Sequence, residues 1–299
     1  MNKIGNVAVI GAGTMGAQIA SLTALSGRHV KLWDASEPAL VAGMARAEND
    51  IFPNLGESRG IDGAALQAAK ARLTAAGSMA EAVAGADLVI EAVREELGVK
   101  QAVFSELSRL TPAILSTNSS SIPSSLIAPV VERPERLLNT HFFAPIWVRS
   151  MLELMTCGAT SDEVMETVYE FGASLGLVTA IVNGESKGFI INRIWRAVKR
   201  ESLRVIDEGV ASPEDVDRLW MMFFQTQYAP FGIMDMVGMD VVSDIETSYQ
   251  LVSQDPTDTP SPTLARMIAE GNLGEKTGKG FYEHPNPAYL EPGFLTGKE

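Results

Sequence analysis

The sequence has very little cysteine and very little histidine. Cys157 is the one cysteine in 299 residues, which excludes an intramolecular disulfide and indicates a reducing compartment. The three histidines, His29, His141 and His284, are too few for us to expect a histidine-built metal site, and we predict no bound metal.

Positive charge and long apolar runs are also scarce. With 24 Lys and Arg against 37 Asp and Glu, the net charge is −13, which argues against nucleic acid or an anionic membrane as the main partner. No apolar run approaches the roughly 18 residues that a membrane-spanning helix needs. We expect a soluble, cytoplasmic protein without a targeting segment, and a small molecule as its partner.

What the chain does contain is a glycine-rich turn in a specific context. In the segment NVAVIGAGTMG, residues 6–16, a strand pattern runs into the turn, and an apolar helix pattern follows at 17–25. In dinucleotide-binding folds the first glycine permits the tight turn, the second lets the backbone approach a pyrophosphate, and the third lets the helix pack closely. The helix N-terminus then binds the pyrophosphate. The predicted cofactor residues of this turn are Gly11, Gly13, Thr14, Met15 and Gly16.

A second predicted strand, at residues 30–33, ends in Asp34. An acidic residue about 20 positions after the turn suits a ribose 2′-hydroxyl, whereas its charge repels a 2′-phosphate. No arginine follows at 35–37, so the sequence predicts NAD rather than NADP as the cofactor. The alternative is an ordinary βαβ unit in which Asp34 is only a turn residue.

The strand pattern predicts an α/β fold with a Rossmann-type doubly wound sheet. Polar residues 91–95 and 118–121 follow two predicted strands, and in such sheets the carboxyl ends of the strands form the ligand crevice. Helical segments at 38–51 and 64–73, interrupted at 53–56, form an excursion from the sheet. This excursion either covers the crevice or is a surface hairpin without a ligand.

His141 ends a strand-like apolar run, and Glu153 lies inside another one. A buried carboxylate is costly unless it has a partner, so we expect the two side chains to pair. Two alternatives stay open: His141 is a satisfied core histidine, or Glu153 points to solvent on an edge strand.

The pattern becomes helical after a polar linker at 183–188. We therefore predict an NAD-binding Rossmann-like domain at 1–184, followed by an all-α domain at 185–299. Asn192 lies in the first turn of the first long helix, at 189–208. Ser161 and Ser212 are predicted helix N-caps.

The chain resembles the NAD-dependent L-3-hydroxyacyl-CoA dehydrogenases of β-oxidation over nearly its full length, which implies a role in fatty acid metabolism. The segments that carry this resemblance are GAGTMG with Asp34, DLVIEAVREELGVK, TNSSSIP, THFFAP with Glu153, KGFIINR and EKTGKGFY.

The resemblance implies a role for each matching residue. His141 matches the catalytic histidine and Glu153 the acid that orients it. Ser120 and Asn192 match residues that contact the substrate oxygen, and Ser120 also contacts the nicotinamide. The residues that match cofactor-proximal positions are Glu95, Lys100 and Lys276. The helical domain of the family also forms a dimer interface, which implies a homodimer.

Two departures from the family pattern concern the substrate. Ala144 stands where family members usually carry Asn, and Trp147 and Arg149 follow it. Family members that bind CoA usually present lysines on the helices after Asp34. Here that region offers mainly Arg46, Arg59, Lys70 and Arg72 among many alanines.

The leading hypothesis is a reversible, NAD-dependent oxidation of a 3-hydroxyacyl-CoA to the 3-oxoacyl-CoA, with His141 and Glu153 as the general base. One alternative is a dehydrogenase of a free 3-hydroxy acid or related small hydroxy acid, whose carboxylate Arg149 binds bidentately. Another is an NAD-binding protein without catalytic turnover.

Overall fold

The structure is a computed structural model that describes residues 4–251, 253, 255 and 258–297. It divides into two compact units, residues 1–190 and 191–299. Each unit has its own clusters of buried apolar side chains, so each is described by itself.

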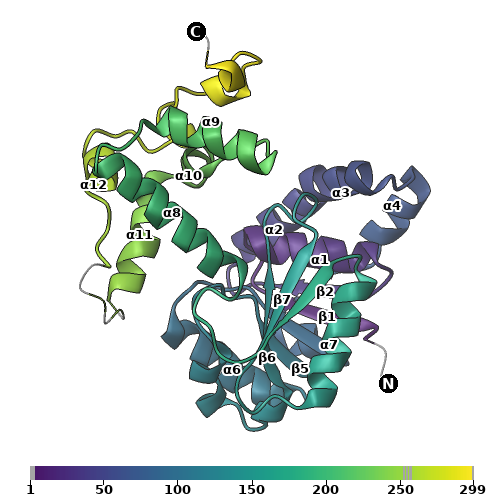
Figure 1. The fold of residues 1–299 in the computed structure, drawn as a ribbon. Coiled ribbons are helices and arrows are strands. Elements are labelled where there is room, and N and C mark those ends of the chain that lie inside the picture. The colour runs from purple at the N-terminus through teal and green to yellow at the C-terminus, as the bar shows by residue number, and fades with distance from the viewer. Residues whose placement is uncertain (1–3, 252, 254, 256–257, 298–299) are drawn as a thin grey trace. The chain divides into compact units, whose positions relative to one another are not determined.

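The first unit is built on an eight-stranded sheet (Figure 1). Its strand order is β3-β2-β1-β4-β5-β6-β7-β8, and all neighbouring strands are parallel except β6 and β7, which are antiparallel. The predicted α/β doubly wound class is confirmed. The strands are β1 (Asn6–Ile10), β2 (His29–Trp33), β3 (Leu73–Ala75), β4 (Leu88–Glu91), β5 (Ile114–Thr117), β6 (Leu137–Phe142), β7 (Met151–Thr156) and β8 (Val178–Val182).

Both faces of this sheet are buried, which explains why its central strands are apolar without alternation. In β1, Val7 and Val9 belong to one core cluster, and Ala8 and Ile10 belong to the cluster on the opposite face. Other strands, the excursion after β2 and the connecting helices supply further members of these clusters. These helices are α1 (Thr14–Leu25), α5 (Met79–Val83), α6 (Leu97–Leu110) and α7 (Asp162–Ser174).

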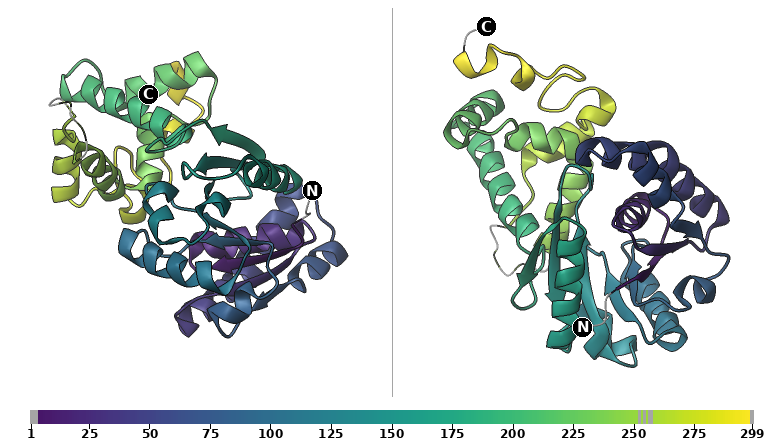
Figure 2. Two further views of the ribbon diagram at one scale, coloured as in Figure 1. Left: turned by 90° about the horizontal axis from the view of Figure 1, so that it is seen from below. Right: turned by 90° about the vertical axis from the view of Figure 1, so that its right-hand side faces the viewer.

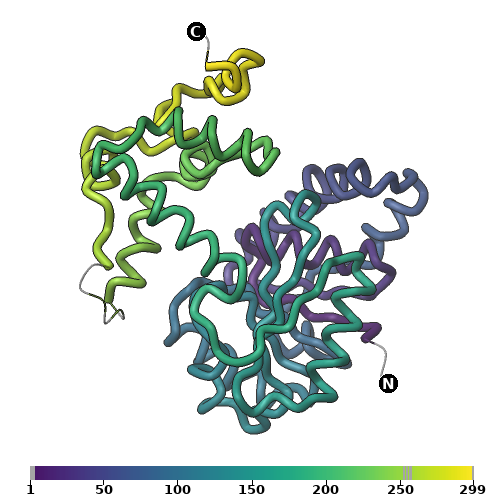
Figure 3. Tube along the Cα trace, in the orientation of Figure 1, coloured from purple at the N-terminus to yellow at the C-terminus, as the bar shows by residue number. Residues whose placement is uncertain are grey.

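The excursion after β2 consists of α2 (Glu37–Arg46), a π-helical stretch (Ala47–Ile51), α3 (Phe52–Arg59) and α4 (Gly63–Lys70). Its course can be followed along the purple-to-blue part of the trace in Figure 3. The predicted interruption at 53–56 is wrong. Pro53 is the second residue of α3, which directly follows the π-helical stretch, and the helix continues through Pro53 without a loop. The predicted helix end at Leu73 is also wrong, because Leu73 begins edge strand β3.

The second unit is helical, as Figure 2 shows from two further directions. Among its described residues the only β-structure is a pair of isolated bridges, Gly274 with Lys279 and Lys279 with Glu283. Its helices are α8 (Ile191–Asp207), α9 (Pro213–Phe224), α10 (Pro230–Val237), α11 (Met239–Gln250) and α12 (Pro262–Ala269).

Two predicted helix caps are confirmed. The Ser161 hydroxyl accepts a hydrogen bond from the Val164 N–H at 3.3 Å at the start of α7. The Ser212 hydroxyl accepts one from the Asp215 N–H at 3.1 Å at the start of α9. Across the described part of the chain, no helix combines the length and the apolar character needed to cross a membrane.

Candidate active site

The glycine-rich turn between β1 and α1 has no room for side chains at two of its glycines. Gly11 has φ +106°, and a Cβ there would lie 2.6 Å from the Ala92 carbonyl oxygen. A Cβ on Gly16 would lie 1.8 Å from the Gly11 carbonyl oxygen. At Gly13 nothing lies within 4 Å of the Cβ position, and no side chain caps α1. The first N–H groups of α1 are therefore open to an anion, as a bound pyrophosphate requires.

Asp34 fixes the same turn from the end of β2. Its Oδ2 accepts a hydrogen bond from the Ala12 N–H at 2.8 Å, and its Oδ1 accepts one from the Ser36 N–H at 2.9 Å. The carboxylate is half-buried, and each oxygen has a further lone pair for a ribose hydroxyl.

A pocket of about 1090 Å³ opens beside Asp34. Trp33, Leu40 and Met44 give it apolar walls, and Asp34, Glu37 and Glu106 are its acidic residues. No Lys or Arg lines it, so the pocket fits the adenosine part of NAD and opposes a 2′-phosphate. Because α2 contributes Glu37, Leu40 and Met44, the first helix of the excursion lines this pocket.

Behind the turn that follows β4, a buried lysine joins two carboxylates. Lys100 Nζ lies 2.7 Å from Glu91 Oε1 and 3.2 Å from Glu95 Oε2, and its side chain is 1% exposed. Glu91 also accepts hydrogen bonds from the Val93 N–H and the Thr117 hydroxyl, both at 2.6 Å. Lys100, predicted to lie near the cofactor, is itself buried and contacts Glu95, whose side chain is 41% exposed; its role toward the cofactor stays a prediction.

Glu95 holds the turn that follows β5. It accepts hydrogen bonds from the Ser119 hydroxyl, from the Ser121 N–H at 3.1 Å and from the Ser121 hydroxyl at 2.8 Å. Burial alone would raise the pKa of Glu95, but the Lys100 charge and these hydrogen bonds outweigh it and lower the pKa. Ser120, between the two serines that Glu95 binds, is exposed.

His141 and Glu153 lie opposite each other on the antiparallel strands β6 and β7. His141 Nδ1 is 3.0 Å from Glu153 Oε2, and the two side chains are 6% and 7% exposed. Asn118 ties this region to the β5 turn, since its Oδ1 accepts the Phe142 N–H at 2.9 Å. The crevice at the carboxyl ends of the strands thus brings the serine turn next to the end of β6.

Several contacts of this pair and of the segment after His141 were not anticipated from the sequence. The Ile190 N–H donates to Glu153 Oε1 at 3.1 Å, and the rings of Phe143 and Phe189 pack on His141. The Gln18 side chain on α1 accepts the Ile146 N–H at 2.9 Å, which connects the glycine-turn helix to the segment after His141. The signal in the sequence was Gln18, the one amide side chain in a largely apolar helix.

The segment that follows His141 carries the departures from the family pattern. Ala144 is exposed, and Arg149 Nη1 donates a hydrogen bond to its carbonyl oxygen. The remaining N–H groups of the Arg149 guanidinium are available, because the residue is exposed.

Two of the predicted site residues belong to the second unit. Asn192 lies in the first turn of α8. Lys276 Nζ forms an ion pair with the Asp240 carboxylate, at 2.6 Å from Oδ2. Their roles toward substrate and cofactor stay predictions.

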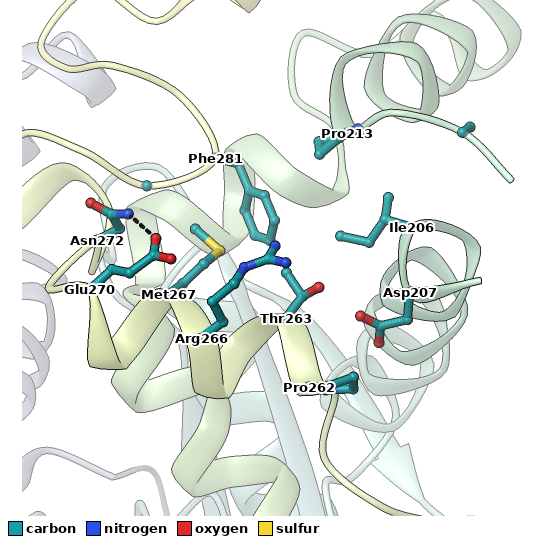
Figure 4. A pocket seen from close by; sticks show the side chains of 12 residues that line it. Ile206, Asp207, Pro213, Pro262, Thr263, Arg266, Met267, Glu270, Asn272 and Phe281 are labelled. Carbon is teal, nitrogen blue, oxygen red and sulfur yellow. Dashed lines mark hydrogen bonds between the residues drawn. The ribbon is translucent and has the colours of Figure 1, made fainter. Parts of the chain in front are cut away.

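The second unit also has a pocket of its own, of about 660 Å³. It is lined from α8, α9, α12 and the following loops, and Figure 4 shows Arg266, Phe281 and Asp207 around it. None of the predicted site residues lines this pocket. Within the described residues, no group of three or more His, Cys, Asp or Glu is arranged to hold a metal ion.

The chain matches two family profiles that together cover most of its length. Residues 6–185 match "3-hydroxyacyl-CoA dehydrogenase, NAD binding domain", and residues 188–284 match "3-hydroxyacyl-CoA dehydrogenase, C-terminal domain". The chain belongs to the 3-hydroxyacyl-CoA dehydrogenase family. It is accordingly an NAD-dependent oxidoreductase of this type, as the sequence predicted.

Individual relatives agree with this assignment. A probable 3-hydroxyacyl-CoA dehydrogenase of Caenorhabditis elegans is 32% identical, with 95% of this chain and 97% of that protein covered. The crystal structure of (S)-3-hydroxybutyryl-CoA dehydrogenase from Ralstonia eutropha has a TM-score of 0.87 at 31% identity, covering 95% of this chain and 100% of the other. A diketoreductase described as acting on dicarbonyl compounds has a TM-score of 0.83 at 32% identity, with the same coverage.

Proposed function

We propose that His141 is the general base of a reversible oxidation of 3-hydroxyacyl-CoA to 3-oxoacyl-CoA and that Glu153 orients it. The observation that carries this proposal is the 3.0 Å contact between His141 Nδ1 and Glu153 Oε2 at the end of β6. With Nδ1–H donated to the carboxylate, the imidazole presents Nε2 as a proton acceptor.

The proton transfer follows from this tautomer. His141 Nε2 takes the proton from the substrate hydroxyl, and the negative charge of Glu153 stabilises the imidazolium that forms. Ser120 and Asn192 hold the reacting oxygen by hydrogen bonds, so that the carbinol carbon keeps its orientation. Bound NAD supplies the hydride acceptor. In the reverse direction the imidazolium returns the proton to the oxygen.

A second substrate class is favoured first by the exposed guanidinium of Arg149 beside Ala144. A free 3-hydroxy acid would offer this guanidinium a carboxylate. One similar structure is a diketoreductase that is described as acting on dicarbonyl compounds, not on CoA thioesters by name.

The basic residues of the excursion support the same alternative. Arg46 donates to the Ala12 carbonyl at 2.7 Å, Arg59 to the Leu175 carbonyl at 2.7 Å, and Lys70 to Glu48 at 2.6 Å. These three side chains are therefore held by contacts within the protein, which leaves fewer basic groups in this region to bind CoA.

The test is a substrate panel read as NADH absorbance at 340 nm, with acetoacetyl-CoA and acetoacetate as the two first members. We expect turnover of the thioester to exceed that of the free acid. Faster turnover of acetoacetate would make the free-acid dehydrogenase the better description. Binding of NAD without turnover of any member would support the third possibility, a non-catalytic NAD-binding protein.

We also propose that the chain divides into an NAD-binding domain at 1–184 and a helical domain at 185–299. We propose further that the helical domain forms a homodimer. The support is an apolar surface on α9, where Leu219 is 67%, Met222 56% and Phe223 80% exposed. Replacing Phe223 by Ser should shift the molar mass measured by light scattering toward the monomer; an unchanged mass would refute this surface as the interface. The free, buried Cys157 supports a cytoplasmic location.

A further inference from the structure

The segment from Ser186 to Ile190 completes the surroundings of the His141–Glu153 pair. The Ile190 N–H donates to Glu153 Oε1 at 3.1 Å, while Glu153 Oε2 faces His141. The Phe189 ring lies on the imidazole with its centroid 4.8 Å away and an interplanar angle of 32°. Adjacent residues thus reach both members of the pair, one through its side chain and the other through its backbone.

The backbone of Phe189 is in an unusual conformation. Its φ is +54°, and among the described residues only Phe189 and Gln225 have a positive φ without being glycine. The left-handed region is unfavourable for a bulky L-residue and persists where surrounding contacts over-determine it.

Local hydrogen bonds supply those contacts. The Phe189 N–H donates to the Ser186 carbonyl oxygen, and the Ser186 hydroxyl donates to the Phe189 carbonyl oxygen, both at 3.0 Å. The Ser186 N–H donates to Sδ of Met155, a residue of β7, at 3.3 Å. The turn is therefore anchored to the strand that carries Glu153.

We propose that Phe189 is a positioning residue for the His141–Glu153 pair. Its left-handed backbone directs the following N–H at Glu153 Oε1, which turns Oε2 toward Nδ1. Its ring and that of Phe143, 4.2 Å from the imidazole centroid, limit rotation of the His141 ring. This inference rests on the proposed function, because it treats the pair as catalytic.

A purely structural role predicts something different. Phe189 is 3% exposed and forms a small apolar cluster with Met155 and Val182. If it only filled that space, its replacement would lower stability, and any effect on catalysis would follow the fraction of unfolded protein. A positioning role instead predicts a fall in kcat with NAD affinity unchanged.

Two substitutions separate the ring from the backbone. Phe189→Gly removes the ring but allows φ +54°, because glycine adopts this region freely. Phe189→Val also removes the ring, and its β-branched side chain opposes the left-handed conformation, so the Ile190 N–H moves away from Glu153. We expect kcat to fall roughly tenfold in the glycine variant and roughly 10²-fold in the valine variant, with KM for NAD within about twofold of the parent.

Gln225 provides the matched control, since it is exposed and has φ +55° at the C-cap of α9. Gln225→Gly should leave kcat unchanged and raise the melting temperature slightly, since glycine relieves the same strain.

Wild-type kcat in both Phe189 variants would overturn the proposal. So would a loss of NAD affinity or of folded protein that accounts for the lost activity. His141→Asn, measured alongside, separates a failure of the proposed function from a failure of the positioning role of Phe189. If it keeps full turnover, the proposed function fails; if it is inactive while both Phe189 variants are active, only the positioning role fails.

Discussion

Each unit of this protein contains a buried histidine paired with a carboxylate. In the first unit His141 Nδ1 lies 3.0 Å from Glu153, and in the second His284 Nε2 lies 3.0 Å from Asp235. The side chains are 6% and 7% exposed in one pair and 5% and 0% exposed in the other. Distance and burial therefore do not distinguish the pair that we propose to be catalytic from the other pair.

The two pairs differ in where they lie and in which backbone groups the carboxylate holds: Glu153 accepts the N–H of Ile190, whereas Asp235 accepts N–H groups of the loop at 281–284. Asp235 accepts the N–H groups of Phe281 and Tyr282 at 2.8 and 2.9 Å in addition to His284. It thereby ties the loop at 281–284 to α10. Glu153 instead lies in β7, opposite a histidine at the end of β6 and near the serine turn of the ligand crevice. The first arrangement holds a loop in place, and the second places an imidazole where a substrate is expected.

The comparison is sharpest when each carboxylate is neutralised. In Glu153→Gln the amide no longer stabilises an imidazolium and favours the wrong tautomer, so kcat should fall by roughly 10²–10⁴. In Asp235→Asn we expect kcat of the folded protein to stay within about twofold and the melting temperature to fall, because a buried acceptor of three hydrogen bonds loses capacity. Equal effects of the two substitutions on kcat would break the distinction.

A second prediction concerns the stability of the folded protein and a buried carboxylate of the second unit, Asp217. Burial raises the pKa of Asp217 to about 6, with the nearby Asp235 charge adding to it, against hydrogen bonds from the Phe231 and Gly232 N–H groups and the Tyr282 hydroxyl. Between about pH 4 and about pH 6 the folded state keeps a proton that the unfolded state loses. Stability should therefore fall as pH rises through this window, by about 3 kcal/mol from this group.

Melting temperatures from pH 4 to pH 7 measure this contribution. Asp217→Asn should flatten the decline, whereas substitution of the exposed Asp207 by Asn should leave it unchanged. A decline of equal slope in the Asp217 variant would assign the pH dependence to other groups.

A smaller effect is expected at Asp34, a carboxylate that is half-buried rather than enclosed like Asp235. Asp34→Ala removes the acceptor for the Ala12 N–H and for a ribose hydroxyl, so KM for NAD should rise roughly tenfold. Discrimination against NADP should weaken at the same time. Glu106→Gln removes a charge from the same pocket without touching the turn, and we expect less than about a twofold change. Unchanged NAD kinetics in Asp34→Ala would show that the carboxylate serves the turn alone.

The sequence predicts the site best where the information is local. The glycine turn follows from steric demands within a short segment, and Asp34 follows from its spacing after that turn and from the chemistry of a ribose hydroxyl. The proposed pairing of His141 with Glu153 needed only that two apolar strands be neighbours, because a buried carboxylate requires a partner. The turn at Phe189 was missed, since a left-handed phenylalanine is set by tertiary contacts and not by residue type. The ion pair of Lys100 with Glu91 was missed for the same reason, as it joins α6 to β4.

The central claim is that His141, and not His284, accepts the substrate proton. The most direct measurement compares His141→Asn with His284→Asn by NADH absorbance with acetoacetyl-CoA, together with NAD affinity. The account predicts a loss of turnover of roughly 10² or more in the first variant, with NAD affinity retained. It predicts turnover within about twofold of the parent in the second, measured on folded protein. Full turnover in His141→Asn, or an equal loss in His284→Asn, would contradict it.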